Sequence, residues 1–269
     1  MTARRLPTKM VAKVWGRDVL PPPFAAPDGE RIGEIWFEPP PEVPDVLVKY
    51  LFTSEKLSVQ VHPSDDTARE GEAGKEECWL VLDADPDARL AIGFERAVTP
   101  GEIAAAARDG TIESLLTWHP ARPGDLFYLP AGTVHAIGPG LSLVEVQQTS
   151  ETTFRLYDYG RPRDLHLERG LEVAEGLPYA AHHKRSVADG QTLVDGPHFR
   201  LDRIAGAPDA TTLEAYPGAL LVLPLEGEVA AKDGSARAGA GECLVADGLD
   251  TLDFGAAAVT LLTQGKRRS

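Results

Sequence analysis

The sequence is poor in cysteine and in basic residues, and each shortage excludes a class of protein. Two cysteines, Cys78 and Cys243, occur among 269 residues; they are too few for a disulfide framework, and neither belongs to a CxxC pair. Lysine and arginine total 27 against 41 acidic residues, which gives a formal net charge of −14. This balance argues against nucleic acid and anionic membrane surfaces as partners, because both require a basic face.

Long apolar runs are also missing. No run approaches the roughly 18 residues of a membrane span, and the opening segment MTARRLPTKM lacks the apolar core and cleavage site of a signal peptide. We therefore expect a cytoplasmic protein. Hydrophobic residues make up 43% of the chain and charged residues 25%, which is typical of a globular protein.

Short β-rich runs, separated by polar or Gly/Pro turns, are the commonest pattern in the chain. They include DVLVKYLFT, KLSVQVH, ECWLVLDA and DLFYLP. This pattern favours an all-β sandwich or barrel over βαβ units. The length permits two domains, and we predict a first β domain over residues 1–185 and a second, smaller β-barrel over residues 186–269.

One helical excursion is predicted at about residues 99–117, inside the first domain. Thr99 precedes Pro100 and Glu102, which is typical of a capped helix start, and Gly110 follows as a breaker. Strand signals return after the excursion, so we expect the helices to interrupt a β domain without ending it.

Gln60 and His62 are polar residues in the otherwise apolar strand KLSVQVH. Residues i and i+2 of a strand project to the same face, so the amide and the imidazole point one way and the flanking valines the other. Lys75 and Glu77 form a second such pair at the start of the apolar strand in GKEECWLVL. An amine and a carboxylate are therefore predicted to share one face.

The segment GDLFYLPAGTVHAI contains the spacing G(x)5PxGxxH, which runs from Gly124 through Pro130 and Gly132 to His135. This spacing resembles the second cupin motif. The Pro and Gly residues shape a turn between strands and return the histidine toward the barrel interior. We therefore predict a cupin (jelly-roll) β-barrel for the first domain.

These segments together offer one amide oxygen, two imidazoles and one carboxylate, from Gln60, His62, Glu77 and His135. Such a donor set suits a borderline divalent ion, most readily one zinc per chain, with positions left for water or substrate. Each residue alone could instead be a hydrogen-bonded polar group of the core, but the combination favours a metal site. The second domain has a single histidine and no PxGxxH turn, so we expect no metal there.

A family resemblance rests on four segments in this order: KLSVQVHPSD, GKEECWLVL, GDLFYLPAGTVHAIGPG and SETTFRLYDYGR. Together they resemble the type I phosphomannose isomerases. The segments VWG and GEIW resemble N-terminal segments of that family, so the resemblance covers about residues 10–165. It implies a zinc-dependent interconversion of mannose 6-phosphate and fructose 6-phosphate through an enediolate, with the same four residues as zinc ligands.

The resemblance also implies roles for cationic residues. Arg155 occupies the position of an active-site arginine of the family and is predicted to stabilise charge near the reacting carbons. Arg161 occupies a position where relatives carry a basic residue, and it is predicted to bind the phosphate through its guanidinium fork. Lys75 is predicted to orient a sugar hydroxyl or to join the proton relay, with a solvated turn lysine as the alternative. We expect Arg163 to be solvated.

Two other functions stay open at this point. A non-catalytic cupin that binds a metal and a sugar phosphate would keep the ligands without needing Lys75 or Arg155. A metal-dependent cupin dioxygenase is disfavoured, because Gln60 stands where a third histidine ligand would be expected. The sequence does not identify the proton-transfer base, the preferred hexose phosphate or the oligomeric state.

Overall fold

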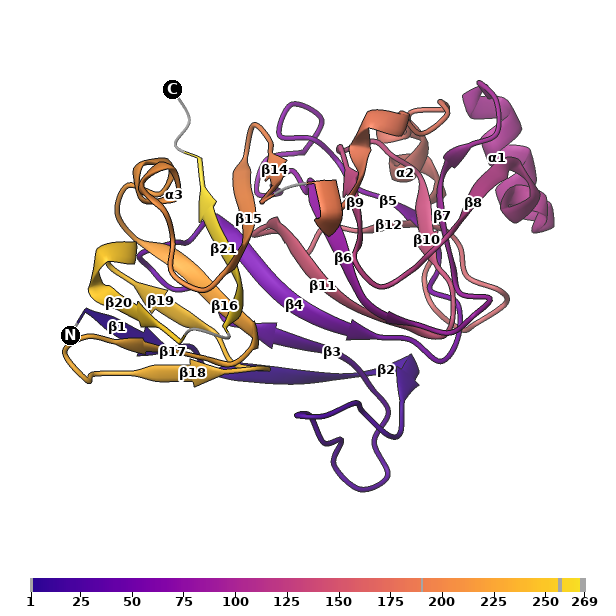
Figure 1. Cartoon of the computed structure of the whole chain (residues 1–269). Coiled ribbons are helices and arrows are strands. Elements are labelled where there is room, and N and C mark those ends of the chain that lie inside the picture. Colours follow the sequence, from indigo (N-terminus) through magenta and orange to yellow (C-terminus); the bar gives the residue numbers. More distant parts are fainter. Residues whose placement is uncertain (1, 190, 256–257, 267–269) are drawn as a thin grey trace.

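The computed structural model describes residues 2–189, 191–255 and 258–266, and β-strands dominate it. The central layer is a seven-stranded antiparallel sheet (Figure 1). In spatial order its strands are β13 (Lys184–Ser186), β9 (Asp125–Leu129), β6 (Glu77–Ala84), β11 (Leu141–Gln148), β4 (Val46–Phe52), β3 (Ile32–Phe37) and β2 (Thr8–Arg17). Strand β6 of this sheet carries Glu77.

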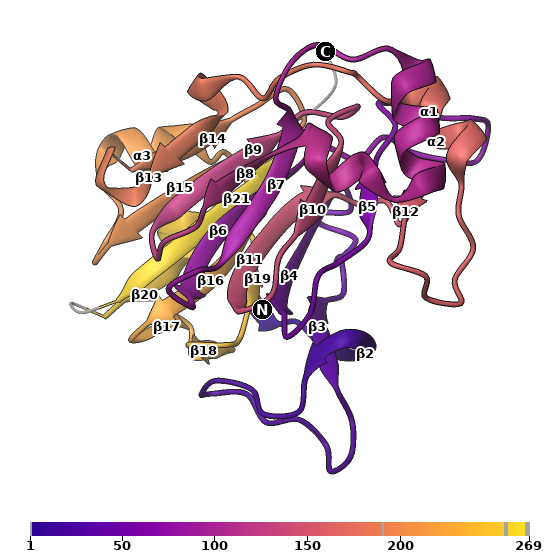
Figure 2. The same cartoon turned by 90° about the vertical axis from the view of Figure 1, so that its right-hand side faces the viewer.

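Two further sheets pack against the central one, and a third, three-stranded sheet packs against the six-stranded sheet (Figure 2). The five-stranded sheet contains β12 (Phe154–Tyr157), β5 (Val59–Val61), β10 (His135–Ile137), β7 (Arg89–Phe94) and β8 (Leu116–Pro120). The six-stranded sheet contains β1 (Ala3–Arg5), β19 (Leu244–Ala246), β16 (Leu220–Glu226), β21 (Val259–Gly265), β15 (Phe199–Ala205) and β14 (Thr192–Asp195). The three-stranded sheet contains β18 (Arg237–Gly239), β17 (Glu228–Ala231) and β20 (Leu252–Phe254).

Strand β4 shows why the sheets stack in layers, because both of its faces are buried. Val48 and Tyr50 belong to a core shared with the six-stranded sheet, to which Leu221 and Leu261 also contribute. The alternate residue Leu51 belongs to a core shared with the five-stranded sheet. A strand with period-two side chains and apolar residues on both faces must lie between two other layers.

The helices are short and lie at the outer edges of these layers. They are α1 (Pro100–Asp109), α2 (Leu167–Val173) and α3 (Ala210–Ala215), with 3-10 turns at Thr111–Leu115, Ala181–His183, Val187–Asp189 and Leu249–Thr251. Helices α1 and α2 share a hydrophobic core with the five-stranded sheet. Within the described residues, no helix combines the length and the apolar character that crossing a membrane requires.

The predicted all-β fold with a helical excursion is confirmed. Helix α1 begins with a capping box in which the Thr99 side chain accepts from the Glu102 N–H and the Glu102 carboxylate accepts from the Thr99 N–H. Gly110 ends it in the left-handed region, at φ 82°. The excursion is shorter than predicted, since Leu116 already begins strand β8.

The division at residue 185 stays a prediction. The six- and three-stranded sheets form mostly from residues after 190, as the second domain would require. Strand β1, however, comes from the start of the chain and pairs with β19, with Ala3 opposite Ala246. The first strand of the chain therefore completes the sheet that the last residues build.

Candidate metal centre and cavity

Three strands of the five-stranded sheet carry polar side chains that lie in one row on the same face. In the register of this sheet, His135 of β10 lies opposite Gln60 of β5, and Gln60 lies opposite Arg155 of β12. Residues directly opposite one another share a face of the sheet. His62 follows two residues after Gln60 and therefore projects to the same face.

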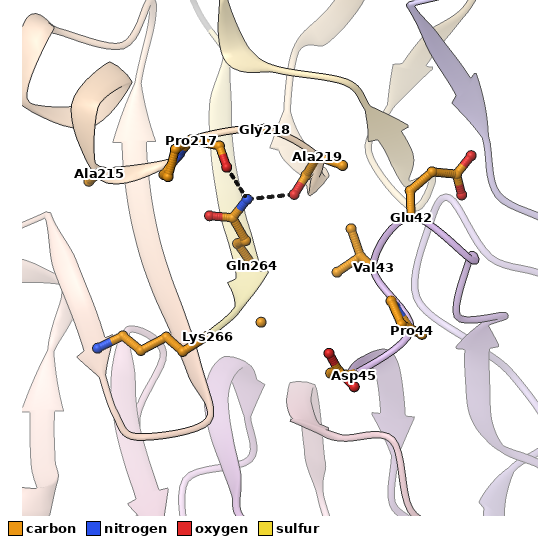
Figure 3. Close-up of a pocket in the computed structure, with 11 residues that line it drawn as sticks. Glu42, Val43, Pro44, Asp45, Ala215, Pro217, Gly218, Ala219, Gln264 and Lys266 are labelled. Carbon is orange, nitrogen blue, oxygen red and sulfur yellow. Dashed lines mark hydrogen bonds between the residues drawn. The ribbon is translucent and has the colours of Figure 1, made fainter. Parts of the chain in front are cut away.

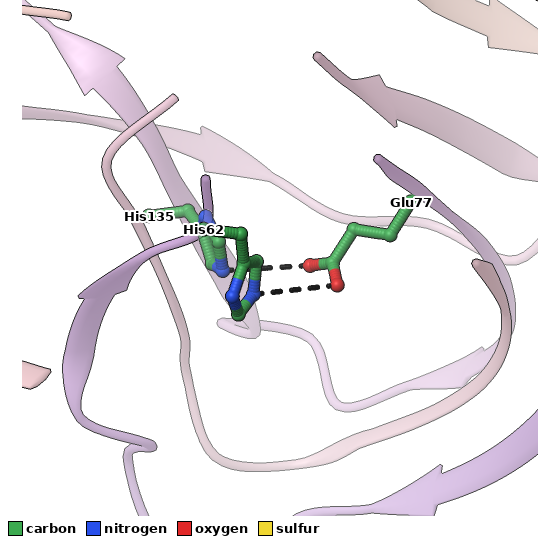
Figure 4. Close-up of side chains that lie close together, drawn as sticks. All are labelled: His62, Glu77 and His135. Carbon is green, nitrogen blue, oxygen red and sulfur yellow. Dashed lines mark ion pairs between the residues drawn. The ribbon is translucent and has the colours of Figure 1, made fainter. Parts of the chain in front are cut away.

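Glu77 approaches this row from the first position of β6 in the central sheet. Figure 4 shows its carboxylate facing the rings of His62 and His135. The Nε2 atoms of the two histidines lie 3.4 Å from Glu77 Oε2 and Oε1 respectively. One ligand atom from each of the three residues can be chosen so that all lie within 4.8 Å of one another, and all three residues are buried. A single metal ion can bridge such a spacing.

Backbone carbonyls orient both imidazoles. His62 Nδ1 lies 2.9 Å from the carbonyl oxygen of Thr152, and His135 Nδ1 lies 2.8 Å from that of Thr133. With Nδ1–H donating to a carbonyl, Nε2 keeps its lone pair for a metal. Burial, and then the charge of Lys75, holds the pKa of His62 well below its ordinary value. Burial also lowers the pKa of His135, so both rings are neutral ligands at neutral pH.

The Glu77 carboxylate provides a test of whether these residues fit a metal. Neither of its buried oxygens accepts a geometrically acceptable hydrogen bond from a described residue, although Lys75 Nζ lies 2.9 Å from Oε2 as an ion pair. Burial would raise the pKa of Glu77, but its interactions with neighbouring groups, the charge of Lys75 first among them, outweigh burial and lower this pKa. A buried, ionised carboxylate with open acceptor positions is suited to metal coordination.

Gln60 adjoins the same site. Its Nε2 lies 3.2 Å from His135 Nε2, while its Oε1 accepts from the hydroxyl of Ser58 at 3.2 Å. A half-turn of the amide exchanges the two atoms and brings the oxygen into the donor set. The Ser58 hydroxyl can accept as well as donate, so it pairs with either orientation. The predicted four-ligand set is therefore compatible with the geometry.

A second row of polar residues crosses the central sheet on the face toward the site. Lys49 of β4 lies opposite Glu145 of β11 and, on its other side, opposite Trp36 of β3. The Lys49 ammonium donates to Glu145 Oε1 at 3.1 Å and lies 4.6 Å from the Trp36 ring centroid. Trp79 Nε1 donates to the other oxygen of Glu145, also at 3.1 Å. The buried carboxylate is thus fully paired.

Lys75 lies deep in the site and not in a solvated turn. Its Nζ is 3.2 Å from His62 Nε2 as well as 2.9 Å from Glu77, and its side chain is only 7% exposed. Burial would lower the pKa of Lys75, but the carboxylates of Glu77 and Glu145 outweigh it and raise that pKa. Lys75 is therefore a charged hydrogen-bond donor beside the candidate ligands.

A cavity of about 430 Å³ opens beside these groups. Its walls include Gln60 and Lys75 together with Arg155, and they also include Arg163. Arg161 is not among the residues that line it. The guanidinium of Arg161 instead pairs with Glu55 at 2.9 Å, outside the cavity. Of the predicted site residues, Gln60, Lys75 and Arg155 line the cavity and Arg161 does not. Arg163, which we expected to be solvated, lines it instead.

Lys49 was not identified from the sequence, although a signal for it exists. It is a single charged residue between Val48 and Tyr50, in a strand that is otherwise apolar. A lysine in such a run is seldom buried without a partner. Glu145 occupies a similar apolar context in β11, but only the strand pairing shows that the two meet.

A larger cavity of about 840 Å³ lies elsewhere, between residues 42–45 and the end of β21 (Figure 3). Two of its polar side chains are paired with groups of the protein. Gln264 donates to the carbonyls of Pro217 and Ala219, and Lys266 pairs with Asp195. The cluster of potential metal ligands lies beside the smaller cavity, which is therefore the candidate site.

The fold and the donor set define the class of protein: a cupin barrel with a candidate metal centre between two of its sheets. Comparisons with known proteins then indicate which family within this class the chain resembles. The chain is 38% identical to the mannose-6-phosphate isomerase ManA of Bacillus subtilis over 198 residues, which are 68% of this chain and 62% of that protein. It is 44% identical to the mannose-6-phosphate isomerase of Streptococcus mutans over 136 residues, 48% of this chain and 43% of the relative. The aligned region thus spans less than two thirds of either relative.

The fold comparison covers more of the chain. The crystal structure of the mannose 6-phosphate isomerase from Bacillus subtilis matches with a TM-score of 0.76 and 25% identity, over 98% of this chain and 99% of that one. No family model matches the sequence. The resemblance to the type I phosphomannose isomerases predicted from the motifs is confirmed by these relatives in both sequence and fold.

Proposed function

We propose that this chain is a zinc-dependent mannose-6-phosphate isomerase, which interconverts mannose 6-phosphate and fructose 6-phosphate through an enediolate. The observation that carries the proposal is that the buried His62–Glu77–His135 cluster contacts Lys75 and Gln60, which line the same cavity as Arg155. The relatives that the chain resembles are named for this activity. A purely structural metal site would not need an open cavity with cationic groups beside it.

The proposed reaction moves a proton between C1 and C2 of the opened sugar, and negative charge develops on the adjoining oxygens. Gln60, His62, Glu77 and His135 would hold the zinc. The bound ion would supply Lewis-acid stabilisation of that charge. A catalytic metal site keeps a position for substrate, and the cavity lined by Gln60 and Lys75 lies next to the three clustered side chains.

Lys75 and Arg155 have distinct roles in this proposal. Lys75 is charged and donates hydrogen bonds, so it orients a sugar hydroxyl or supplies a proton to the developing oxyanion. Arg155 lines the cavity and, among the described residues, has no carboxylate within ion-pair distance. Its positive charge is therefore available to stabilise the charge that develops near C1 and C2.

A coupled assay with mannose 6-phosphate, with and without a chelator, tests the proposal. We expect turnover by the untreated protein, about one zinc per chain, loss of turnover on chelation, and recovery when zinc is added back. Full activity without metal would contradict the proposed site. Iron or manganese in place of zinc would keep the ligands and change the ion, and binding without conversion would favour the non-catalytic alternative.

The substrate class and the location belong to the same proposal. A sugar phosphate is the small-molecule partner that the relatives' names suggest. The cytoplasmic location predicted from the sequence stays a prediction, which cell fractionation can test.

A further inference from the structure

Two arginines, Arg161 and Arg163, follow a tight turn after β12. The Arg161 N–H donates to the carbonyl of Asp158 at 3.0 Å and closes a four-residue turn. The two central residues, Tyr159 and Gly160, are both in the left-handed region, at φ 57° and 75°. Left-handed geometry is costly for a tyrosine and is therefore a sign that the turn is held in place by its surroundings.

The carboxylate of Asp158 fixes the turn from inside. Its side chain is 1% exposed. Arg163 binds it in a fork, with Nε 2.6 Å from Oδ2 and one terminal nitrogen 2.6 Å from Oδ1. A bidentate contact of this kind sets the plane and direction of the guanidinium. Among the described residues, the other terminal nitrogen of Arg163 has no hydrogen-bond partner.

Arg161 shares Asp158 but is directed differently. One terminal nitrogen donates to the carbonyl of Lys56 at 2.8 Å, and the other pairs with Glu55 at 2.9 Å. Its guanidinium also lies over the Tyr159 ring, 5.4 Å from the centroid. With these partners Arg161 is occupied outside the cavity, whereas Arg163 lines it.

The exposed fractions of the charged side chains distinguish the buried floor of the cavity from its solvent-exposed mouth. Lys75, which lines the cavity beside the candidate metal ligands, has a side chain that is 7% exposed. Arg163 and Lys13, which also line the cavity, are 27% and 31% exposed. If C1 and C2 of the sugar lie at the floor, the phosphate on C6 reaches toward the mouth, where these two cations lie.

We propose that Arg163, held by Asp158, and not Arg161, binds the phosphate group of the sugar phosphate at the mouth of the cavity. The proposal rests on the proposed function and names the residue behind its phosphate selectivity. A dianionic phosphate monoester needs a local positive cluster here, because the protein as a whole carries a net charge of −14. Within the described part of the chain, one terminal nitrogen of Arg163 stays free to donate to a phosphate oxygen, and the bidentate contact with Asp158 keeps that nitrogen in a fixed direction.

Two matched variants test this inference. Arg163→Met and Arg161→Met each remove one partner of Asp158, but only the first removes a cation from the cavity wall. Calorimetric titration with mannose 6-phosphate and with inorganic phosphate should show about ten-fold or greater weakening in R163M. We expect R161M to bind both ligands within about two-fold of the unmodified protein. Zinc content and melting temperature, measured in each variant, separate a binding defect from a folding defect.

If R163M does not fold, a third variant, Arg163→Lys, is used to test the inference. It keeps a positive charge but loses the fork, so binding should lie between that of the unmodified protein and that of a neutral Arg163→Gln variant. Unchanged phosphate binding in the neutral variants, or a loss in R161M as large as in R163M, overturns the inference. If the unmodified protein binds mannose 6-phosphate without converting it, the proposed function fails, while the contrast between the two arginines is still measured.

Discussion

At the scale of the residue, strand register decides which polar side chains can share a metal and which can contact only the substrate. His135 and Gln60 lie opposite each other on adjacent strands, and Arg155 lies one strand further away. Adjacent strands are about 4.8 Å apart, so Arg155 is roughly 10 Å from His135 along the row. That distance is too long for a shared ligand set and suits a contact with the sugar.

Two alanine variants separate these roles. His135→Ala removes an imidazole from the candidate ligands, so zinc content and turnover should fall together. Arg155→Ala should keep its zinc and lower kcat by about two to three orders of magnitude, because it removes charge stabilisation near the reacting carbons. Metal analysis and steady-state kinetics on both proteins check the prediction. Wild-type kcat in R155A, or full zinc and turnover in H135A, would contradict the assignments.

At the scale of the element, the PxGxxH turn joins two ligand-bearing segments. The Gly132 N–H donates to the carbonyl of His62 at 2.9 Å, and its carbonyl accepts from the Glu175 N–H at 2.8 Å. Gly132 is in the left-handed region at φ 85°, where an added Cβ would lie 2.9 Å from Glu175 Cγ and 3.1 Å from the carbonyl oxygen of Val173. The turn thus positions His135 and His62 together, and only glycine fits it without strain.

Gly132→Ala should therefore weaken metal binding as well as stability. Left-handed alanine costs about 1–2 kcal/mol, and the close backbone contact adds to this by moving the turn. Gly29→Ala is a matched control, since Gly29 is at φ 79° with open space around the added Cβ. Both variants should lose stability in chemical denaturation, but G29A should keep the zinc affinity of the unmodified protein. Equal zinc affinity in the two variants would show that the turn does not position the ligands.

At the scale of the whole molecule, the two halves of the chain share a hydrophobic core. Val144 of the central sheet and Leu261 of the six-stranded sheet belong to the same buried cluster. The four tryptophans lie at positions 15, 36, 79 and 118, all before residue 185. Tryptophan fluorescence therefore reports only on the first half, while circular dichroism reports on both.

Leu261→Ala should destabilise both halves together. The substitution empties part of the shared core and should cost about 2–5 kcal/mol. The fluorescence and circular-dichroism melting curves should shift downward by the same amount and stay coincident. Leu213→Ala is the control, because Leu213 lies in the same half and is 41% exposed. A fluorescence transition that does not move in L261A would mean that the halves unfold independently.

Short-range patterns in the sequence were enough to predict several local features. The capping box at Thr99 and the break at Gly110 depend on neighbouring residues, and both are present in the structure. The shared face of Gln60 and His62 follows from the two-residue period of a strand. These features depend on backbone geometry over a few residues, which is why the sequence alone determined them.

Other features required the tertiary structure, because they depend on which distant segments become neighbours. Pairing of β4 with β11 brings Lys49 to Glu145, 96 positions along the chain. Pairing of β1 with β19 places Ala3 beside Ala246. The directions of Arg161 and Arg163 follow from a buried carboxylate and a left-handed turn, which the family resemblance and the spacing of the two arginines do not encode. The sequence by itself determined the local strand and turn geometry and which residues are candidate ligands, and only the packing of the sheets decided which charges face the cavity.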